Sequence, residues 1–224
     1  MTEKVKQKQT EQLVHRLVEA IDEAPDKFNN YYDLGSLLTR LQDYEQAEEL
    51  FMKALGLFEP KGDQKAINLL KYGLGNLYYS VGQVDKAITY YNQIEDAKLK
   101  GDSYLMLAQS YMKKKQYKQA VAYGLTALDL RPDDPEIAQV LGDSCLALGE
   151  FKSAKDYYDR ILKRHPGRAD TQFNRGLVAM ALGEPHESFL THAKQLDLDY
   201  YEKSEKRIAD IEHTLQELDG HAKK

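Results

Sequence analysis

The chain has 224 residues, of which 42% are hydrophobic and 30% are charged, and its 31 basic and 36 acidic side chains give a net charge of −5. This is the composition of a folded domain, neither disordered nor built into a membrane. The acidic balance argues against a nucleic-acid partner, because such binding depends mainly on neutralising phosphates. A single cysteine excludes an internal disulfide and fits a cytoplasmic location.

The first predicted element lies in the N-terminal segment 1–27 and is a helix over about residues 4–24. No apolar stretch in this segment could act as a signal peptide, and no run of about 18 apolar residues occurs that could span a membrane. We therefore expect a protein without a membrane partner. The helix should cover one end of the fold with its aliphatic residues, which are Leu13, Val14, Leu17, Val18 and Ile21.

Residues 28–199 contain five copies of one pattern, which start at residues 28, 68, 101, 135 and 169. In each copy a small residue at position 8 is followed by another at position 20. The pairs are Gly35/Ala47, Gly75/Ala87, Ala108/Ala120, Gly142/Ala154 and Gly176/Ser188. The first members are spaced by 40, 33, 34 and 34 residues. A period in the thirties is typical of a solenoid, in which each unit buries its apolar face against its neighbours.

Each copy is predicted to form two helices. Apolar or small residues at positions 4/5, 7, 8 and 11 follow helical spacing, and a second helix carries the small residue at position 20. We expect the two helices to cross most closely at positions 8 and 20, and the residue at position 24 to fill the space between hairpins. The turns between the helices, where glycine allows left-handed backbone, are Gln42-Asp43, Gly82-Gln83, Lys115-Gln116, Gly149-Glu150 and Gly183-Glu184.

These positions resemble the tetratricopeptide repeat, whose pattern runs from an aromatic residue through Leu-Gly, an aromatic, Ala, an aromatic and Ala to Pro. The fourth copy matches closely, with Val140-Leu141-Gly142 followed by Ala154, Tyr158 and Pro166. The resemblance covers about residues 28–200. It implies an all-α, right-handed superhelical solenoid of helix-turn-helix hairpins with a capping helix at each end.

Some segments depart from the pattern. The second copy follows an extra stretch at about 59–64 and loses a residue near 95–101, so its boundaries are expected to be irregular. The fifth copy is degenerate, with Arg175, Pro185, His192 and Gln195 where apolar or small residues are usual. A C-terminal capping helix is predicted over 200–219 from Ile208, Ile211, Leu215 and Leu218, and 220–224 should form a flexible tail.

No motif predicts catalysis, a metal or a cofactor, so we expect a non-catalytic protein. None of the six histidines pairs with another at metal-binding helical spacing, and no phosphate loop, GxSxG or zinc spacing occurs. Cys145 lies at position 11, a packing site, which favours a buried inert thiol over a nucleophile. The basic cluster Lys113-Lys114-Lys115-Gln116-Tyr117-Lys118 is interpreted as a solvated turn, with capture of an acidic partner as the alternative.

The resemblance places positions 2, 5, 9, 12 and 13 in a concave groove, where the family binds extended peptides or a partner's helix. Amide side chains can hold a peptide backbone, and tyrosine and methionine supply adaptable contacts. The alternative for these residues is packing between adjacent first helices. The candidate groove residues are Tyr32, Ser36, Tyr72, Asn76, Tyr79, Leu105, Gln109, Met112, Gln139, Asp143, Phe173 and Leu177.

One subgroup of the family clamps the C-terminal carboxylate of chaperones. It uses Lys and Asn at positions 5 and 9 of one repeat, Asn at position 9 of the next, and Lys and Arg at positions 5 and 9 of the third. The first three copies here offer Tyr32/Ser36, Asn76 and Leu105/Gln109. Because only Asn76 matches, binding of a chaperone carboxylate is not expected.

The sequence therefore predicts a cytoplasmic adaptor that holds a peptide or segment of another protein in the groove, without catalysis. The alternative is an assembly subunit that oligomerises or docks through the degenerate fifth repeat and the C-terminal helix. A third hypothesis, a peptide-sensing regulator, would require a DNA-reading helix-turn-helix. The segment 1–27 has room for only one helix.

Overall fold

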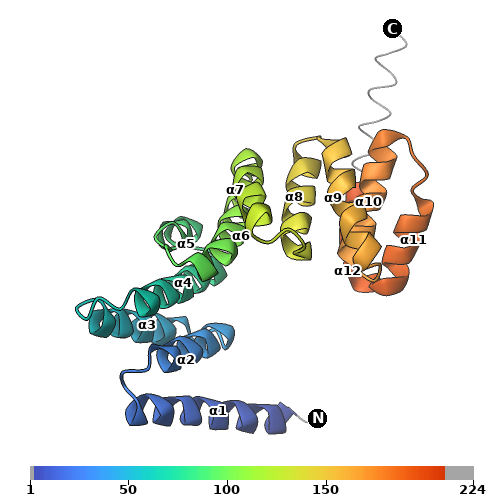
Figure 1. The fold of residues 1–224 in the computed structure, drawn as a ribbon. Coiled ribbons are helices and arrows are strands. Elements are labelled where there is room, and N and C mark those ends of the chain that lie inside the picture. The colour runs from blue at the N-terminus through green and yellow to red at the C-terminus, as the bar shows by residue number, and fades with distance from the viewer. Residues whose placement is uncertain (1–2, 210–224) are drawn as a thin grey trace. The chain divides into compact units, whose positions relative to one another are not determined.

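The computed structural model describes residues 3–209, which form helices and turns without strands (Figure 1). The predicted all-α architecture of helical hairpins is confirmed. The helices are α1 (Glu3–Glu23), α2 (Phe28–Arg40), α3 (Tyr44–Phe58), α4 (Gln64–Ser80), α5 (Val84–Tyr91), α6 (Ala97–Lys113), α7 (Tyr117–Leu130), α8 (Pro135–Ala147), α9 (Phe151–Arg164), α10 (Ala169–Leu182), α11 (Glu187–Leu196) and α12 (Leu198–Ser204).

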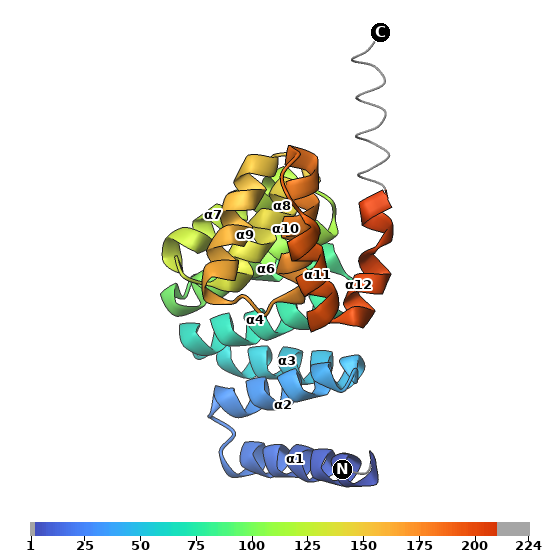
Figure 2. The ribbon, with the colours of Figure 1, turned by 90° about the vertical axis from the view of Figure 1, so that its right-hand side faces the viewer.

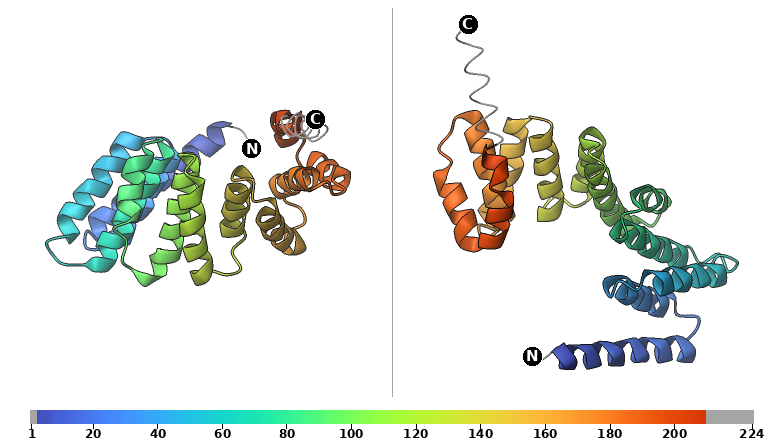
Figure 3. Two further views of the ribbon diagram at one scale, coloured as in Figure 1. Left: turned by 90° about the horizontal axis from the view of Figure 1, so that it is seen from above. Right: turned by 180° about the vertical axis from the view of Figure 1, so that it is seen from behind.

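The chain divides into two compact units, residues 1–114 with α1–α6 and residues 115–224 with α7–α12. In the first unit α2 pairs with α3 and α4 pairs with α5, and the first helices α2, α4 and α6 pack in series (Figure 2). In the second unit α8 pairs with α9 and α10 pairs with α11, while α12 packs on α10 and α11 (Figure 3). Each unit thus buries its apolar surface between successive hairpins.

The glycine at position 8 of three hairpins makes room for the aromatic ring at position 24. A Cβ atom on Gly75 would lie 2.5 Å from Cε1 of Tyr91, and one on Gly142 would lie 2.6 Å from Cε1 of Tyr158. Gly35 stands in the same relation to Phe51. The sequence pattern paired position 8 with the small residue at position 20, whereas the structure shows that the ring at position 24 requires the glycine.

The turns between paired helices use left-handed backbone, as predicted from their glycines. Gly82, Gly149 and Gly183 have φ of 79°, 75° and 69°. Gln42 and Lys115 adopt the same conformation at the equivalent turns, with φ of 64° and 58°. This conformation is costly for residues with a Cβ atom, so the turn geometry is imposed by the hairpin at these two positions.

The irregular boundaries around the second repeat have a defined structure. Helices α4 and α6 begin at Gln64 and Ala97, one turn before the predicted starts at 68 and 101, and α5 has only eight residues. Buried Asn68 organises the stretch that follows α5, because its Oδ1 accepts hydrogen bonds from the backbone N–H of Glu95 at 2.6 Å and of Asp96 at 3.2 Å. The Asp96 carboxylate then caps α6.

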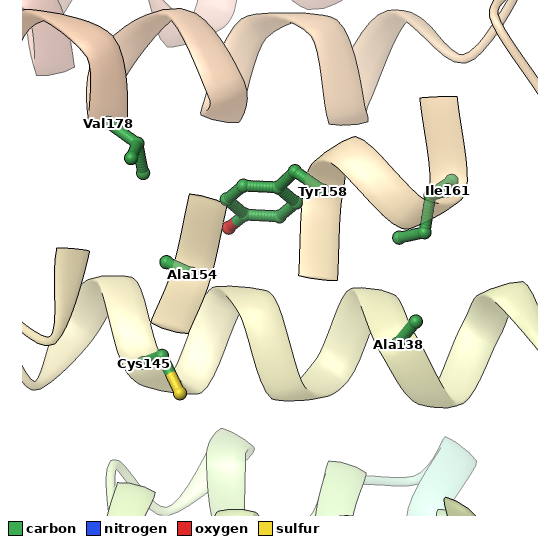
Figure 4. Packing of buried hydrophobic residues seen from close by; sticks show 6 residues of the cluster. All are labelled: Ala138, Cys145, Ala154, Tyr158, Ile161 and Val178. Carbon is green, nitrogen blue, oxygen red and sulfur yellow. The ribbon is translucent and has the colours of Figure 1, made fainter. Parts of the chain in front are cut away.

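The second unit has a core between α8, α9 and α10. In Figure 4 the ring of Tyr158 lies between α8 and the helix that carries Val178. Cys145 belongs to this cluster, and burial raises the pKa of its thiol to about 11, with a smaller effect from Glu150. The predicted burial of Cys145 is thus confirmed, and at this pKa the thiol is protonated at neutral pH.

Arg175 explains how the degenerate fifth repeat accepts a charge at a core position. The side chain is buried, and its Nε donates to Asp159 Oδ1 at 2.6 Å while Nη2 donates to Glu184 at 3.3 Å. The guanidinium carbon lies 4.7 Å from the centre of the Phe189 ring. Two carboxylates and an aromatic face thus replace the usual leucine contacts.

Both ends of the array carry an extra helix. Helix α1 packs on α2, where Asn30 Nδ2 donates to the Ala20 carbonyl at 2.6 Å, yet Leu13 and Val18 of the predicted apolar stripe remain exposed. Helix α12 begins at Leu198, the chain turns at Glu205, and it is helical again up to residue 209. Ile211, Leu215, Leu218 and the tail 220–224 lie outside the described residues.

Candidate functional site

The predicted groove face of the first unit carries a cluster of tyrosines. The predicted groove face is the face formed by positions 5, 9, 12 and 13 of the first helices. Tyr32 from α2 and Tyr72 and Tyr79 from α4 are each half-buried. They surround buried Tyr91 of α5, whose ring centre lies 5.8 Å from that of Tyr72. Burial raises the pKa of Tyr91, and the three neighbouring phenols add to the effect.

Asn76 of α4 is joined to this cluster by a hydrogen bond. The Tyr91 hydroxyl donates to Asn76 Oδ1 at 2.8 Å, which fixes the orientation of the amide. The Nδ2 group has no hydrogen-bond partner among residues 3–209, and the side chain is partly exposed. An oriented amide with a free donor is suited to bind the carbonyl of an extended peptide.

The lysines at the edge of this face are engaged within the first unit. Lys113 Nζ lies 4.6 Å from the centre of the Tyr79 ring and donates to the Tyr79 carbonyl at 3.2 Å. Lys114 forms an ion pair with Asp85. Two lysines of the basic cluster thus have intramolecular partners, which favours the interpretation as a solvated turn.

The remaining candidates of the first unit differ in exposure. Ser36 is partly exposed beside Tyr32. Burial raises the pKa of Tyr32, and a hydrogen bond with Ser36 offsets part of this increase. On α6, Gln109 and Met112 are partly exposed, whereas Leu105 is buried. Leu105 is therefore a packing residue in this structure, the alternative foreseen for such positions.

In the second unit the polar candidates are satisfied internally. Oδ1 of Asp143 accepts hydrogen bonds from Tyr158 at 2.7 Å, Asn174 at 2.8 Å and Gln139 at 2.9 Å. Gln139 also accepts a bond from Thr171 at 2.6 Å. Burial raises the pKa of Asp143, while its three hydrogen bonds and the nearby positive charge of Arg207 act in the opposite direction. The structure brings Gln139 and Asp143 together, but as parts of a network between α8, α9 and α10.

Phe173 and Leu177 are core residues, although the sequence analysis placed them on the exposed groove face. Their exposed fractions are 0% and 1%, because they form a core cluster with Met180 and Ala193 against which Tyr200 and Tyr201 of α12 pack. The Phe173 ring meets the rings of Tyr200 and Tyr201 edge to face, with centres 6.0 and 5.6 Å apart. Tyr200 and Tyr201 lie beyond the last repeat, so the repeat pattern did not indicate this contact.

A separate cavity of about 530 Å³ opens beside α3, α4 and α5. Tyr78 and Tyr90 line it as a stacked pair with ring centres 5.4 Å apart, and the Tyr78 hydroxyl donates to Glu48. Lys86 lies 4.7 Å from the centre of the Tyr78 ring. The Tyr78 hydroxyl and the Lys86 ammonium group are thus engaged within the first unit.

The part of the chain that the structure describes contains no cluster of His, Cys, Asp or Glu side chains suited to a metal ion. Nor does any helix within it combine the length and the apolar composition required to cross a membrane.

Serial helical hairpins, with glycine at position 8 beneath a ring at position 24, define a helical-repeat protein. Three tetratricopeptide repeat models match residues 26–100, 72–135 and 111–180. The chain therefore belongs to the tetratricopeptide repeat family.

Several known proteins are similar to this chain. A Drosophila melanogaster protein described as a BBSome complex member BBS4 homolog is 27% identical over 143 residues, which cover 59% of this chain and 28% of the relative. This chain thus matches little more than a quarter of that protein.

Among solved structures, YrrB, described as a TPR protein with an unusual peptide-binding site, has a TM-score of 0.62 and 24% identity, covering 85% of this chain and 97% of YrrB. Pseudomonas aeruginosa pilF has a TM-score of 0.73 and 19% identity, covering 90% and 92%. These two likenesses show the fold.

Proposed function

We propose that this protein is a non-catalytic cytoplasmic adaptor that binds an extended segment of a partner protein on the predicted groove face of its first unit. The observation that carries the proposal is Asn76, whose amide is oriented by Tyr91 and keeps a free donor between half-exposed tyrosines. YrrB, a neighbour by fold, is described as having a peptide-binding site.

The side chains on this face favour a particular class of segment. Asn76 Nδ2 would donate to a peptide carbonyl, and the rings of Tyr32, Tyr72 and Tyr79 would contact apolar or aromatic side chains. Of the two cations at position 13 of these first helices, Lys113 is engaged on Tyr79, so Arg40 remains without the second cation that the carboxylate clamp requires. We therefore expect recognition of an internal, uncharged stretch, with micromolar affinity of about −8 kcal/mol.

Affinity capture from native lysate tests the proposal. The wild-type protein is compared with Asn76→Ala and Tyr72→Ala, and with Asn92→Ala as a matched control at an exposed asparagine just after α5. We expect proteins that bind the wild type and the control but are lost with the two groove variants, because each loses more than about 1 kcal/mol of binding energy. Thermal unfolding must show that the variants stay folded. Equal capture by all four proteins would contradict the proposal.

A second candidate function is an assembly subunit that docks through its C-terminal end. Leu196 and Leu198 flank the junction of α11 and α12, with 47% and 48% of their surfaces exposed. Light scattering on the wild type and on a Leu196→Ser, Leu198→Ser variant separates the two functions. A stable dimer that the variant loses favours assembly, and a monomer in both cases favours the adaptor.

A further inference from the structure

The cavity of about 530 Å³ in the first unit lies beside a departure from the repeat. The second helices of the first, third and fourth repeats, which are α3, α7 and α9, have 15, 14 and 14 residues, whereas α5 has only eight (Figure 1). Helix α5 ends at Tyr91, so the next part of the cavity wall is Gln93, which lies in a turn. A cavity of this volume is large enough to hold a ligand.

Two helical stripes form the walls of the cavity. One stripe runs along α3 from Met52 to Glu59, and the other runs from Lys86 in α5 to Gln93, each at spacings of three and four residues. Each stripe is therefore about 10 Å long, which is the length of three residues of extended chain. The α4 side chains that line the cavity lie at positions 4 and 11 of the repeat, and not at positions 5, 9, 12 and 13. The cavity is therefore separate from the predicted groove face.

Lys71 of α4 brings an unpaired positive charge to this cavity. It occupies position 4, where Tyr31, Ala138 and Gln172 of other repeats are buried, yet the lysine is half-buried and lines the cavity. Its ammonium group has no hydrogen-bond or ion-pair partner among residues 3–209. Because partial burial of a charge is costly unless the charge is paired, an anionic group of a ligand would be favoured here.

The other charged groups at the cavity leave its lining with an excess of positive charge. Lys86 lies 4.7 Å from the centre of the Tyr78 ring, and Glu59 is the single carboxylate among the described residues that line the cavity. Glu48, outside the lining, accepts a hydrogen bond from the Tyr78 hydroxyl. Two ammonium groups and one exposed carboxylate thus line the cavity of a chain whose net charge is −5. This local inversion of charge favours an acidic ligand.

Gly56 leaves the α3 wall of the cavity open to an apolar group. A Cβ atom on this glycine would meet nothing within 4 Å, so packing within the chain does not require glycine here. Glycine disfavours a helix, whereas a wall without a side chain lets a ligand approach the backbone closely. On the same stripe Met52 has 49% of its surface exposed, and the Tyr90 hydroxyl lies 4.0 Å from its sulfur. A thioether and a phenol ring are suited to contact an aromatic side chain.

We propose that this cavity is a binding site for a short extended segment of a partner protein, in which an aromatic and an acidic residue lie two positions apart. Side chains at this spacing point to the same face of an extended chain. The aromatic ring would contact Met52, Gly56 and Tyr90. The carboxylate would bind Lys71 Nζ, while the exposed amide of Gln93 would pair with the peptide backbone. None of these residues belongs to the predicted groove face, so this proposal and the proposed function can fail separately.

Selection of random displayed peptides on the full-length protein tests the proposal, with counter-selection on Gly56→Leu. The leucine side chain would enter the cavity, and leucine favours a helix, so this variant should stay folded. Because the variant keeps the predicted groove face, counter-selection removes peptides that bind there. We expect the remaining peptides to share an aromatic and an acidic residue two positions apart. Recovery of no peptide that prefers the wild type, or of peptides without an acidic residue, would overturn the proposal.

Charge substitutions then test the assigned contacts with the tightest selected peptide, whose binding is measured by fluorescence anisotropy. Lys71→Gln should weaken binding about tenfold, the effect of losing one charge-assisted hydrogen bond. Lys65→Gln, at an exposed lysine of α4 outside the lining, is the matched control and should change nothing. Glu59→Gln should strengthen binding because it removes a like charge from the cavity. Asn76→Ala should leave this binding unchanged, and thermal unfolding shows that each variant is folded. Equal affinities of the two lysine variants would overturn the proposal.

Discussion

The Tyr91 hydroxyl donates a hydrogen bond to Asn76 Oδ1 across the hairpin of α4 and α5, and an equivalent bond joins Tyr158 to Asp143 in the hairpin of α8 and α9. In both hairpins a tyrosine at position 24 fixes a polar side chain at position 9. The amide of Asn76 keeps a donor group without an intramolecular partner, whereas Asp143 accepts hydrogen bonds from three side chains of the same unit. The same hairpin geometry thus holds a partly exposed amide in the first unit and a polar network between helices in the second.

The coupling between Tyr91 and Asn76 is directly measurable. Tyr91→Phe removes the hydroxyl and should cost about 1 kcal/mol of unfolding free energy, the usual net value of such a bond. In a double-mutant cycle with Asn76→Ala, urea denaturation should give a coupling energy of about 0.5–1.5 kcal/mol. Strictly additive effects would show that the bond does not orient the amide.

The glycine beneath the ring at position 24 gives a prediction with an internal control. Gly75→Ala should destabilise the protein by about 1–3 kcal/mol, because the new Cβ atom would lie 2.5 Å from the Tyr91 ring. Gly56→Ala in α3 has nothing within 4 Å and should stabilise the protein by up to about 1 kcal/mol through helix propensity. Thermal or urea unfolding measures both changes. Similar effects of the two substitutions would refute the packing explanation.

Two turns can be improved by substitution. Gln42→Gly and Lys115→Gly should each raise the unfolding free energy by about 0.5–1 kcal/mol, because both residues have positive φ and glycine adopts this conformation without a steric penalty. The reverse change, Gly149→Ala, should lower stability at the equivalent turn. Denaturant midpoints that do not move in these directions would show that positive φ carries no steric cost at these turns.

The stability of the second unit should depend on the ionisation of Asp143. Burial raises its folded-state pKa above the ordinary value of 3.8, so the folded protein binds this proton more tightly than the unfolded chain does. The stabilising contribution is therefore present below pH 3.8 and is lost as the pH rises through the folded-state pKa.

Comparison with Asp143→Asn isolates this contribution, because the other titrating groups are shared. The unfolding free energy of the wild type minus that of the variant should fall as the pH rises from about 4 and then level off above the folded-state pKa. Urea denaturation across this range provides the measurement. A difference that grows with pH would mean that the folded protein favours the carboxylate.

Arg175 should respond differently to two truncations. Arg175→Leu restores the residue found at position 7 of the other four repeats and should cost less than about 1.5 kcal/mol, since Asp159 and Glu184 are exposed enough to be hydrated. Arg175→Ala leaves a cavity beside Phe189 and should cost about 2–4 kcal/mol. Equal costs would indicate that the ion pairs, and not the filled volume, stabilise this site.

Local sequence patterns were sufficient for the hairpins, their turns and the buried Cys145, because these depend on helical spacing and on glycine within one repeat. The contact of Asn68 with residues 95 and 96 depends on a side chain that meets backbone groups nearly a full repeat away, and no spacing rule indicates it. The early starts of α4 and α6 follow from this contact and from aspartate caps.

The candidate site was predictable only in part. Tyr72, Asn76 and Tyr79 share a helical face by spacing alone, so their grouping follows from the sequence. The burial of Phe173 does not, because Tyr200 and Tyr201 lie beyond the last repeat, where no register defines which face they cover. The charge at position 7 indicated a degenerate fifth repeat, but it did not indicate that Arg175 is held by two carboxylates through Nε and Nη2 while its Nη1 stays buried without a hydrogen-bond partner in the described structure.

The space shared by Gly75 and Tyr91 has an evolutionary consequence. A methyl group on residue 75 would lie 2.5 Å from the Tyr91 ring, so a substitution that enlarges residue 75 alone lowers stability. A substitution that makes residue 91 smaller must therefore come before one that makes residue 75 larger. The hairpin, and not the single helix, is therefore the smallest segment of this array that duplication or recombination can exchange intact.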